Sequence, residues 1–333
     1  MLLCSACAEE EPSKVVLAPA PTVVARGETE PVGTSNADAA DDPAIWRNAA
    51  DPAASLIVAT DKKAGLYVYG LDGKPRSFLA AGRLNNVDVL DLRQRGVLVV
   101  ASDRNDEANA KLQLYRLDPG TAKLVPLGAV TGGKGEAYGV CLWDSGEALY
   151  AFSVLKSGQV HQVRIDLGPS PTGSIVRTLR MKTQTEGCVV DPRSRHLYVG
   201  EEDVGIWRFA AEPTAPVKGA LVAAVDGKQL IADVEGLALA TIGTGGGFLL
   251  ASSQGDNAYA LFELPALRPA GRFRVARGKF GSAEETDGIE IALGDFGPDY
   301  PGGLLVVQDG ENDPRAQNFK LVAWADVVAA LAK

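Results

Sequence analysis

The feature that most constrains the fold is a sixfold internal repeat with a period of about 49 residues. Each repeat opens with a turn residue and a short alternating strand, and the openings fall at Pro43, Val87, Gly139, Gly187, Gly236 and Gly288. A continuous apolar run follows roughly ten residues later, and a third strand follows that run. Because no helical periodicity interrupts these strands, the pattern predicts one blade of four antiparallel strands per repeat.

Most repeats also contain a candidate fourth strand, which we place near residues 77–79, 124–127, 175–178 and 272–275. The last repeat has none before the chain ends, and residues 22–26 are predicted to supply it. That pairing would close the ring and leave no open sheet edge. The sequence therefore predicts an all-β, six-bladed β-propeller over residues 25–333. A two-domain β-sandwich is the alternative, but it does not explain six units in phase.

The first 24 residues are predicted to lie outside the propeller. Cys4 and Cys7 stand in an opening Met-Leu-Leu-Cys-Ser-Ala-Cys, and an acidic, Pro-rich stretch follows. This arrangement resembles the partial signal and disordered tether of a bacterial lipoprotein, with Cys7 as the candidate lipid anchor. The alternative is a disordered segment with two incidental cysteines. We expect a location outside the cytoplasm, in the periplasm, on the outer membrane or secreted.

The net charge of −9 and the pI near 4.9 argue against a nucleic-acid partner. The same charge would repel a polyanionic small molecule unless cations intervene. We expect a monomer that acts on a small-molecule substrate.

A ring of oxygen-bearing residues is predicted at one mouth of the central channel, where the turns before the innermost strands meet. The residues that precede the six openings are Asp42, Asn86, Tyr138, Glu186, Glu235 and Asp287, and Asp41, Asp88 and Asp233 lie close to them. Carboxylates crowded around one axis repel one another unless cations are bound, and hard oxygen ligands suit Ca²⁺. Asp and Asn are also common turn residues, but six oxygen-bearing residues at equivalent positions of the six repeats favour a metal site.

The turns after the second strands add basic residues at the same mouth. Lys62, Arg104 and Lys156 occupy these turns in the first three repeats, and Glu201, Glu202, Gln254 and Asp309 occupy them in the later ones. Cations that face metal-loaded carboxylates form a clamp for phosphate. The sequence thus predicts a phosphate ligand.

Other phosphatase chemistries lack the residues that they require. The two histidines, His161 and His196, lie outside any Arg-His-Gly motif and read as surface strand residues, too few for a zinc or iron hydrolase. Cys141 and Cys188 lack the Gly-rich, Arg-terminated loop of a thiolate phosphatase. We expect buried thiols at these two positions, with a disulfide as the alternative.

Several motifs resemble those of the β-propeller phytases. They include residues 41–46 (Asp-Asp-Pro-Ala-Ile-Trp), 84–88 (Leu-Asn-Asn-Val-Asp), 233–236 (Asp-Val-Glu-Gly), 285–288 (Glu-Thr-Asp-Gly) and 308–312 (Gln-Asp-Gly-Glu-Asn). The matches run in order from residue 28 to about residue 328. The resemblance implies a six-bladed fold, several Ca²⁺ ions and hydrolysis of the calcium salt of phytate, myo-inositol hexakisphosphate, to inorganic phosphate and lower inositol phosphates.

The resemblance also implies roles for single residues. Asp42, Tyr138, Glu186, Asp233 and Glu235 are expected to bind catalytic calcium, and Lys62, Arg104 and Lys156 to bind phosphate. Asp88 is expected near the channel axis, and Asp287, Asp309 and Asn312 around a structural or channel calcium. The full set of candidate metal ligands adds Asp41, Asn86, Glu201 and Glu202. Ser157 stands where the family often has an acidic residue, so the adjacent, affinity-raising phosphate site is expected to differ.

These expectations lead to a mechanistic hypothesis with two rivals. We expect direct attack on phosphorus by a calcium-activated water, without a covalent phosphoenzyme. A six-bladed, calcium-dependent lactonase or esterase is one rival, and it would not need the three basic positions. A non-catalytic propeller that binds phosphorylated ligands is the other.

Overall fold

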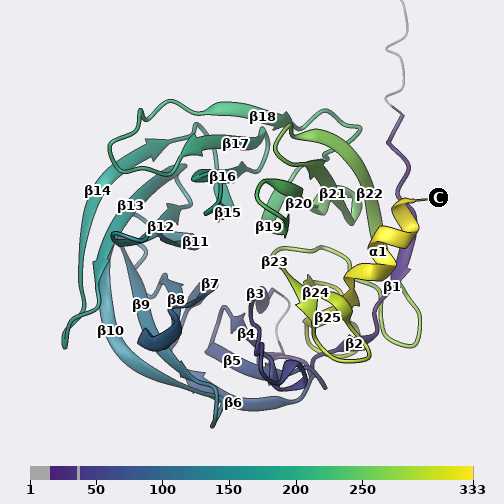
Figure 1. Cartoon of the computed structure of the whole chain (residues 1–333), viewed down its shortest axis with the longest axis horizontal. Coiled ribbons are helices and arrows are strands. Elements are labelled where there is room, and N and C mark those ends of the chain that lie inside the picture. Colours follow the sequence, from purple (N-terminus) through teal and green to yellow (C-terminus); the bar gives the residue numbers. More distant parts are fainter. Residues whose placement is uncertain (1–15, 36–37, 333) are drawn as a thin grey trace, which may run out of the picture.

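The computed structural model describes residues 16–35 and 38–332, so Cys4, Cys7 and the predicted lipid anchor lie outside the described part of the chain. Six antiparallel sheets surround a central axis in sequence order, as Figure 1 shows. The predicted six-bladed β-propeller is therefore confirmed. Within the described residues, no helix is long and apolar enough to cross a membrane.

The strands of each blade run outward from the axis in chain order. Blade 1 contains β3 (Ala40–Trp46), β4 (Leu56–Asp61), β5 (Gly65–Gly70) and β6 (Pro75–Ala80), and blade 2 contains β7 (Leu84–Asp91), β8 (Val97–Asp103), β9 (Asn109–Asp118) and β10 (Lys123–Lys134). Blade 3 contains β11 (Ala137–Asp144), β12 (Leu149–Leu155), β13 (Gln159–Asp166) and β14 (Thr172–Arg180), and blade 4 contains β15 (Thr185–Asp191), β16 (His196–Glu201), β17 (Gly205–Ala210) and β18 (Ala220–Ala224). Blade 5 contains β19 (Val234–Ile242), β20 (Gly246–Ser253), β21 (Ala258–Glu263) and β22 (Arg268–Ala276), and blade 6 contains β23 (Ile289–Asp295), β24 (Pro301–Asp309) and β25 (Asn318–Ala323).

An N-terminal strand closes the ring, as predicted, but it is a different segment from the predicted one. β2 (Gly27–Glu28) pairs antiparallel with β25 and completes blade 6. Most of the predicted closing segment instead forms β1 (Thr22–Val24), which adds to β22 of blade 5 as a parallel fifth strand. The chain thus bridges two blades before it enters blade 1, and a two-residue strand such as β2 carries no alternation that a sequence reading could detect.

Two further elements lack a counterpart in the sequence prediction: β18, the fourth strand of blade 4, and the helix α1 (Trp324–Leu331). The helix follows β25 directly and packs Trp324 and Val327 against blades 5 and 6. Arg26 donates to both carboxylate oxygens of Asp326, at 2.7 and 2.6 Å, which joins the N-terminal segment to this helix.

The core consists of apolar layers between neighbouring blades. Between blades 1 and 2, for example, Val58 and Val68 pack with Leu84 and Val99, and all four side chains are buried. Each such burial contributes roughly 1.5–3 kcal/mol. Because every blade packs against two neighbouring blades, the positions of the inner strands around the axis are fixed.

A β-bulge recurs in the innermost strands of blades 1 to 5. Each inner strand has one more residue than its partner between two paired positions, for example between Ala40 and Pro43 in blade 1 and between Leu84 and Val87 in blade 2. The corresponding shifts fall in β11, β15 and β19. A bulge locally redirects side chains, and these bulges lie at the end of the channel where the functional residues are predicted.

Candidate active site

The first residue of each bulge forms the ring at the channel mouth. The register places Asp41, Asn85, Tyr138, Glu186 and Glu235 at this position, and Asp287 takes the equivalent place before β23. In the first two repeats, the predicted ring residue is therefore one position too late, because Asp42 and Asn86 occupy the second bulge position. The reason is that Pro43 and Val87 align with the residues after the openings of the later blades.

Glycine fills the second bulge position in blades 3 to 5. A Cβ atom on Gly139 would lie 1.9 Å from the carbonyl oxygen of Glu186, and one on Gly187 would lie 2.1 Å from that of Glu235. Neighbouring inner strands thus pack backbone against backbone. In blade 1, where Asp42 takes this position, its Oδ2 accepts a hydrogen bond of 3.0 Å from the Val87 amide of blade 2.

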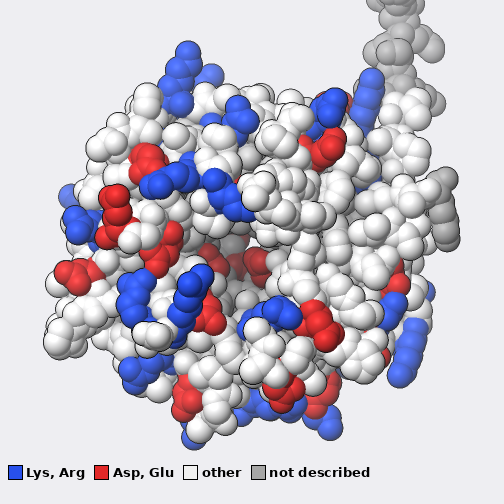
Figure 2. Space-filling view, in the orientation of Figure 1, with Lys and Arg blue, Asp and Glu red and all other residues white. Residues whose placement is uncertain are grey.

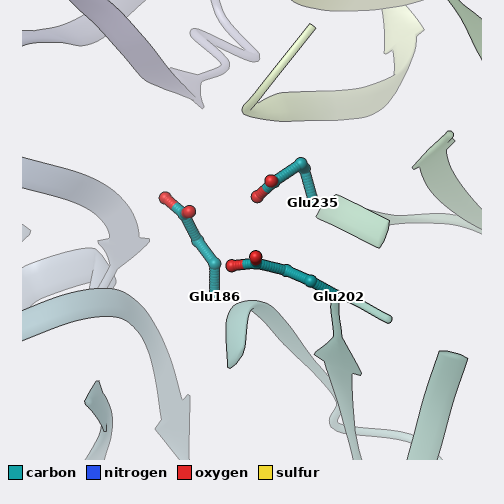
Figure 3. Close-up of side chains that lie close together, drawn as sticks. All are labelled: Glu186, Glu202 and Glu235. Carbon is teal, nitrogen blue, oxygen red and sulfur yellow. The ribbon is translucent and has the colours of Figure 1, made fainter. Parts of the chain in front are cut away.

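Three buried glutamates converge at the mouth. Glu186 on β15, Glu202 just after β16 and Glu235 on β19 bring carboxylate oxygens within 4.8 Å of one another (Figure 3). Within the described residues, Glu202 Oε1 and Glu235 Oε2 have no hydrogen-bond partner. An all-oxygen donor set with unsatisfied atoms fits a hard cation such as Ca²⁺.

Burial raises the pKa of all three carboxyl groups. The pKa of Glu202 rises to about 7, and the charge of nearby Asp233 adds to the effect of burial. Without a cation, Glu186 and Glu235 hold their charge poorly, chiefly because both are buried. Nearby carboxylates add to this effect, Asp41 and Asp287 at Glu186 and Glu186 at Glu235. The predicted ligand Asp233 is half-buried, lies directly before β19 and is not one of the three converging glutamates.

Lys62 joins two other members of the ring. Its Nζ lies 2.8 Å from Asp41 Oδ1 and 3.3 Å from Asp287 Oδ2, and it also contacts Asp38. Gln254 donates to Asp287 from the other side, at 2.7 Å. One cation thus stands among the carboxylates of blades 1 and 6.

Arg104 and Lys156 flank the ring of Tyr138. The Arg104 guanidinium carbon lies 5.7 Å from the ring centre and Lys156 Nζ lies 5.2 Å from it. Burial and the charge of Glu186 raise the pKa of Tyr138, so the phenol stays protonated. The structure therefore brings the three predicted phosphate-binding residues to the same mouth as the glutamates. Figure 2 shows the resulting hollow, with Asp and Glu side chains inside it and Lys and Arg side chains around it.

Strand alternation separates the acidic residues at the ends of the second strands. Lys62, Arg104 and Lys156 each come directly after the last residue of a second strand that pairs with the inner strand. Glu202 and Gln254 occupy this same position in blades 4 and 5. Glu201 and Asp309 stand one residue earlier in their strands. Glu201 accepts hydrogen bonds from the amides of Lys182 and Thr183 and from the Trp207 indole. Successive side chains of a strand point to opposite faces, so Glu201 faces away from the trio.

Asp309 and Asn312 form a second group around the buried ammonium of Lys320. Lys320 Nζ lies 2.9 Å from Asp309 Oδ2, 3.2 Å from Asn312 Oδ1 and 2.8 Å from Glu28 Oε2. This lysine already supplies a positive charge to the group. A structural calcium at Asp309 and Asn312 stays a prediction.

A cavity of about 220 Å³ lies in the channel and is lined in part by Asp42, Asp88 and Glu290. Burial raises the pKa of Asp88 to about 6, and burial also raises the pKa of Asp42 and Glu290. Asp88 Oδ2 accepts a hydrogen bond of 2.7 Å from the Leu142 amide. Asp88 therefore lies along the channel, as expected.

Some mouth residues have no counterpart in the sequence prediction. Asn85 is buried and contacts Asp41, Glu186 and Arg104. Glu136 forms an ion pair of 2.8 Å with Arg104, and Glu290 lines the channel. One sequence signal could have revealed which residues form the bulges of blades 1 and 2. Thr60 and Ser102, in phase on the second strands, accept 2.9 Å hydrogen bonds from the amides of Asp42 and Asn86.

The cysteines and histidines differ from expectation in part. Cys141 on β11 and Cys188 on β15 form a disulfide, so the expectation of free thiols is wrong and the alternative holds. His161 is buried and contacts Thr178, whereas a surface position was expected. His196 opens β16, the strand that ends at Glu201 next to the mouth. Neither histidine is a member of the ring.

Comparisons with known proteins agree with this geometry. The protein-family model described as Phytase matches residues 2–333. A 3-phytase of Bacillus subtilis (strain 168) is 38% identical over 326 residues, which cover 93% of this chain and 85% of that protein. Among solved structures, the PQQ-bound aldose sugar dehydrogenase of Streptomyces coelicolor aligns with a TM-score of 0.56 and 12% identity, over 92% of this chain and 99% of that one. At that identity the likeness concerns the fold alone.

Proposed function

Because this chain belongs to the phytase family and is a phosphoric monoester hydrolase that acts on phytate, we propose that calcium ions at its channel mouth make that hydrolysis possible. One observation carries the proposal: three buried glutamates, two of which have an unsatisfied oxygen, converge beside three cations at the same mouth. A net charge of −9 would otherwise repel a substrate with six phosphate groups.

The carboxylates and the cations have separate tasks in this proposal. Glu186, Glu202 and Glu235 would hold calcium, with Asp41, Asp233 and Asp287 at the edges of the site. Bound calcium supplies positive charge at the phosphate and lowers the pKa of coordinated water. Further ligand roles are proposed for Asp42, Asn86, Asp88 and Tyr138 at the mouth and in the channel, and for Glu201, Asp309 and Asn312 at positions apart from the trio.

The three cations would orient the reacting phosphate. Lys62 and Lys156 are point charges, and Arg104 offers a planar fork that can donate two parallel hydrogen bonds to phosphate oxygens. Arg104 and Lys156 both contact the ring of Tyr138, and these cation–π contacts would help to hold them at the mouth. Charge that develops on the equatorial oxygens is then met by fixed donors.

We propose that water accepts the phosphoryl group directly. The mouth residues are carboxylates, amides, a phenol and cations, and this set offers groups to orient a water rather than a paired nucleophile and base. The product would be inorganic phosphate and a lower inositol phosphate.

A location outside the cytoplasm, with Cys7 as a lipid anchor, remains part of the proposal. The disulfide between Cys141 and Cys188 supports this location, because such bonds persist mainly in oxidising compartments. Family membership favours the phytase over the calcium-dependent lactonase or esterase and over a propeller that only binds phosphorylated ligands.

Calorimetric titration with calcium tests the metal site without turnover. The variant Glu235→Gln removes one charge from the trio and should weaken calcium binding at least tenfold. Glu263→Gln is the matched control, since Glu263 lies exposed at the end of β21. Wild-type calcium affinity in Glu235→Gln would refute the proposed site.

A further inference from the structure

Asn85 connects three functional groups of the mouth although its own side chain is fully buried. Its Nδ2 donates to Asp41 Oδ2 at 3.1 Å and to Glu186 Oε1 at 2.8 Å. Its Oδ1 accepts a hydrogen bond from Arg104. One amide therefore contacts a carboxylate of blade 1, a carboxylate of blade 4 and the cation of its own blade.

An amide suits this position better than the side chains found in the rest of the ring. A carboxylate here would face Asp41 and Glu186 with a like charge, which is costly at a buried site. An apolar side chain would leave two buried acceptors and one buried donor without this partner. Asn85 offers donors toward the acids and an acceptor toward the base at the same time.

The surroundings of Arg104 make this contact important. Glu136 holds Arg104 at Nη2, at 2.8 Å, and the ring of Tyr138 lies beside the guanidinium. The contact with Asn85 engages the other terminal nitrogen, Nη1. Both ends of the guanidinium are thus fixed by protein groups, which sets the direction in which it faces the mouth.

We propose that Asn85 is a positioning residue that aligns Arg104 for phosphate and Glu186 for the cation, an inference that rests on the proposed function. It acts through these two side chains and does not touch the reacting atoms. Its two halves have separate effects: the amide oxygen governs Arg104, and the amide nitrogen governs Glu186.

Two variants separate these halves. Asn85→Ala removes both contacts, whereas Asn85→Asp retains an oxygen for Arg104 and loses the donor to the carboxylates. Binding of inorganic phosphate to the calcium-saturated protein, measured by calorimetry without turnover, should weaken about tenfold in Asn85→Ala and by less than about threefold in Asn85→Asp. Calcium affinity of the substrate-free protein should fall about tenfold in Asn85→Ala.

Kinetics and stability complete the test. Both variants should lose roughly 10- to 100-fold in kcat/KM for phytate well below their unfolding temperature, where a purely structural defect would leave the folded molecules fully active. Asn109→Ala is the control, because Asn109 is exposed and its amide bonds Asp106 in the same blade.

The inference is overturned if Asn85→Ala matches the wild type in phosphate and calcium binding. It is also overturned if Asn85→Asp and Asn85→Ala weaken phosphate equally. Two further variants, Arg104→Ala and Glu235→Gln, show whether a negative result concerns the role of Asn85 alone or the proposed function as a whole. If these two bind phosphate and calcium normally, the proposed function fails; if they are impaired while Asn85→Ala is not, only the role of Asn85 fails.

Discussion

Lys62 shows how a single residue is tuned at the mouth. Burial acts against its charge, but Asp41 and Asp287 outweigh that effect and raise its pKa, so the ammonium persists at any physiological pH. A permanent charge beside a set of carboxylates can balance them in the free protein and meet a phosphate in the complex.

Removing this charge should therefore impair phosphate chemistry. We expect Lys62→Ala to lower kcat/KM for phytate by roughly 10²- to 10³-fold, the usual effect of losing one donor to a developing oxyanion. Lys63→Ala is the matched control, since the neighbouring Lys63 side chain is 43% exposed. Equal kcat/KM values for the two variants would refute the role of Lys62 in binding the reacting phosphate.

The raised carboxyl pKa values predict how the calcium-free protein responds to pH. Burial raises the pKa of Asp287 to about 8 and that of Glu202 to about 7, against about 4 in an unfolded chain. The folded state thus retains protons that the unfolded chain has released. Stability is highest while these groups are protonated and falls as pH rises toward 8.

Thermal unfolding after calcium removal measures this effect. The unfolding temperature should be lower at pH 8.5 than at pH 6.5, and added calcium should raise it more at pH 8.5, where the carboxylates are charged. A calcium-free protein that is more stable at pH 8.5 would contradict the assignment of these groups.

At the scale of elements, the bulge in the inner strands of blades 1 to 5 brings the functional residues together. It adds one residue at the mouth, and the glycine that follows in blades 3 to 5 allows the next strand to approach. The ring residues are thus fixed by backbone packing as well as by side-chain contacts.

Gly139→Ala tests this packing. Its Cβ would overlap the carbonyl oxygen of Glu186, and we expect a loss of about 1–3 kcal/mol in the free energy of unfolding together with weaker calcium binding. Gly245→Ala is the control, because no heavy atom lies within 4 Å of a Cβ at that position. Urea unfolding of both variants makes the measurement, and equal stability would refute the packing argument.

The bulges also explain what a sequence reading could and could not predict about the site. Tyr138, Glu186, Glu235 and Asp287 are predictable because each precedes a glycine that marks the phase. In blades 1 and 2 the second bulge residue is polar as well, so the sequence predicts Asp42 and Asn86 at the ring positions that Asp41 and Asn85 occupy. One inserted residue leaves no mark in a repeat whose length already varies.

At the scale of the whole molecule, the fold was predictable because each repeat carries its own set of apolar strands. The contacts that close the ring were harder to predict, because β2 has only two residues and follows the longer strand β1 in the chain. The disulfide depends on two inner strands of different blades, and their approach is known only once the ring is built.

The disulfide joins blades 3 and 4 across a sequence separation of 47 residues. Restricting an unfolded loop of this size should stabilise the protein by about 4 kcal/mol. The double variant Cys141→Ala/Cys188→Ala should therefore unfold at clearly lower urea concentration than the wild type under non-reducing conditions. An unchanged midpoint, or free thiols at both positions in the native protein, would contradict the cross-link.

The central claim is that phytate hydrolysis at this mouth requires calcium. It is tested most directly by phosphate release from phytate during a calcium titration of protein whose metal has been removed and whose metal content has been checked. The account predicts no release without calcium, activity that rises with calcium until the sites fill, and no such rise in Glu186→Gln/Glu235→Gln. Full phosphate release from the verified metal-free protein would contradict it.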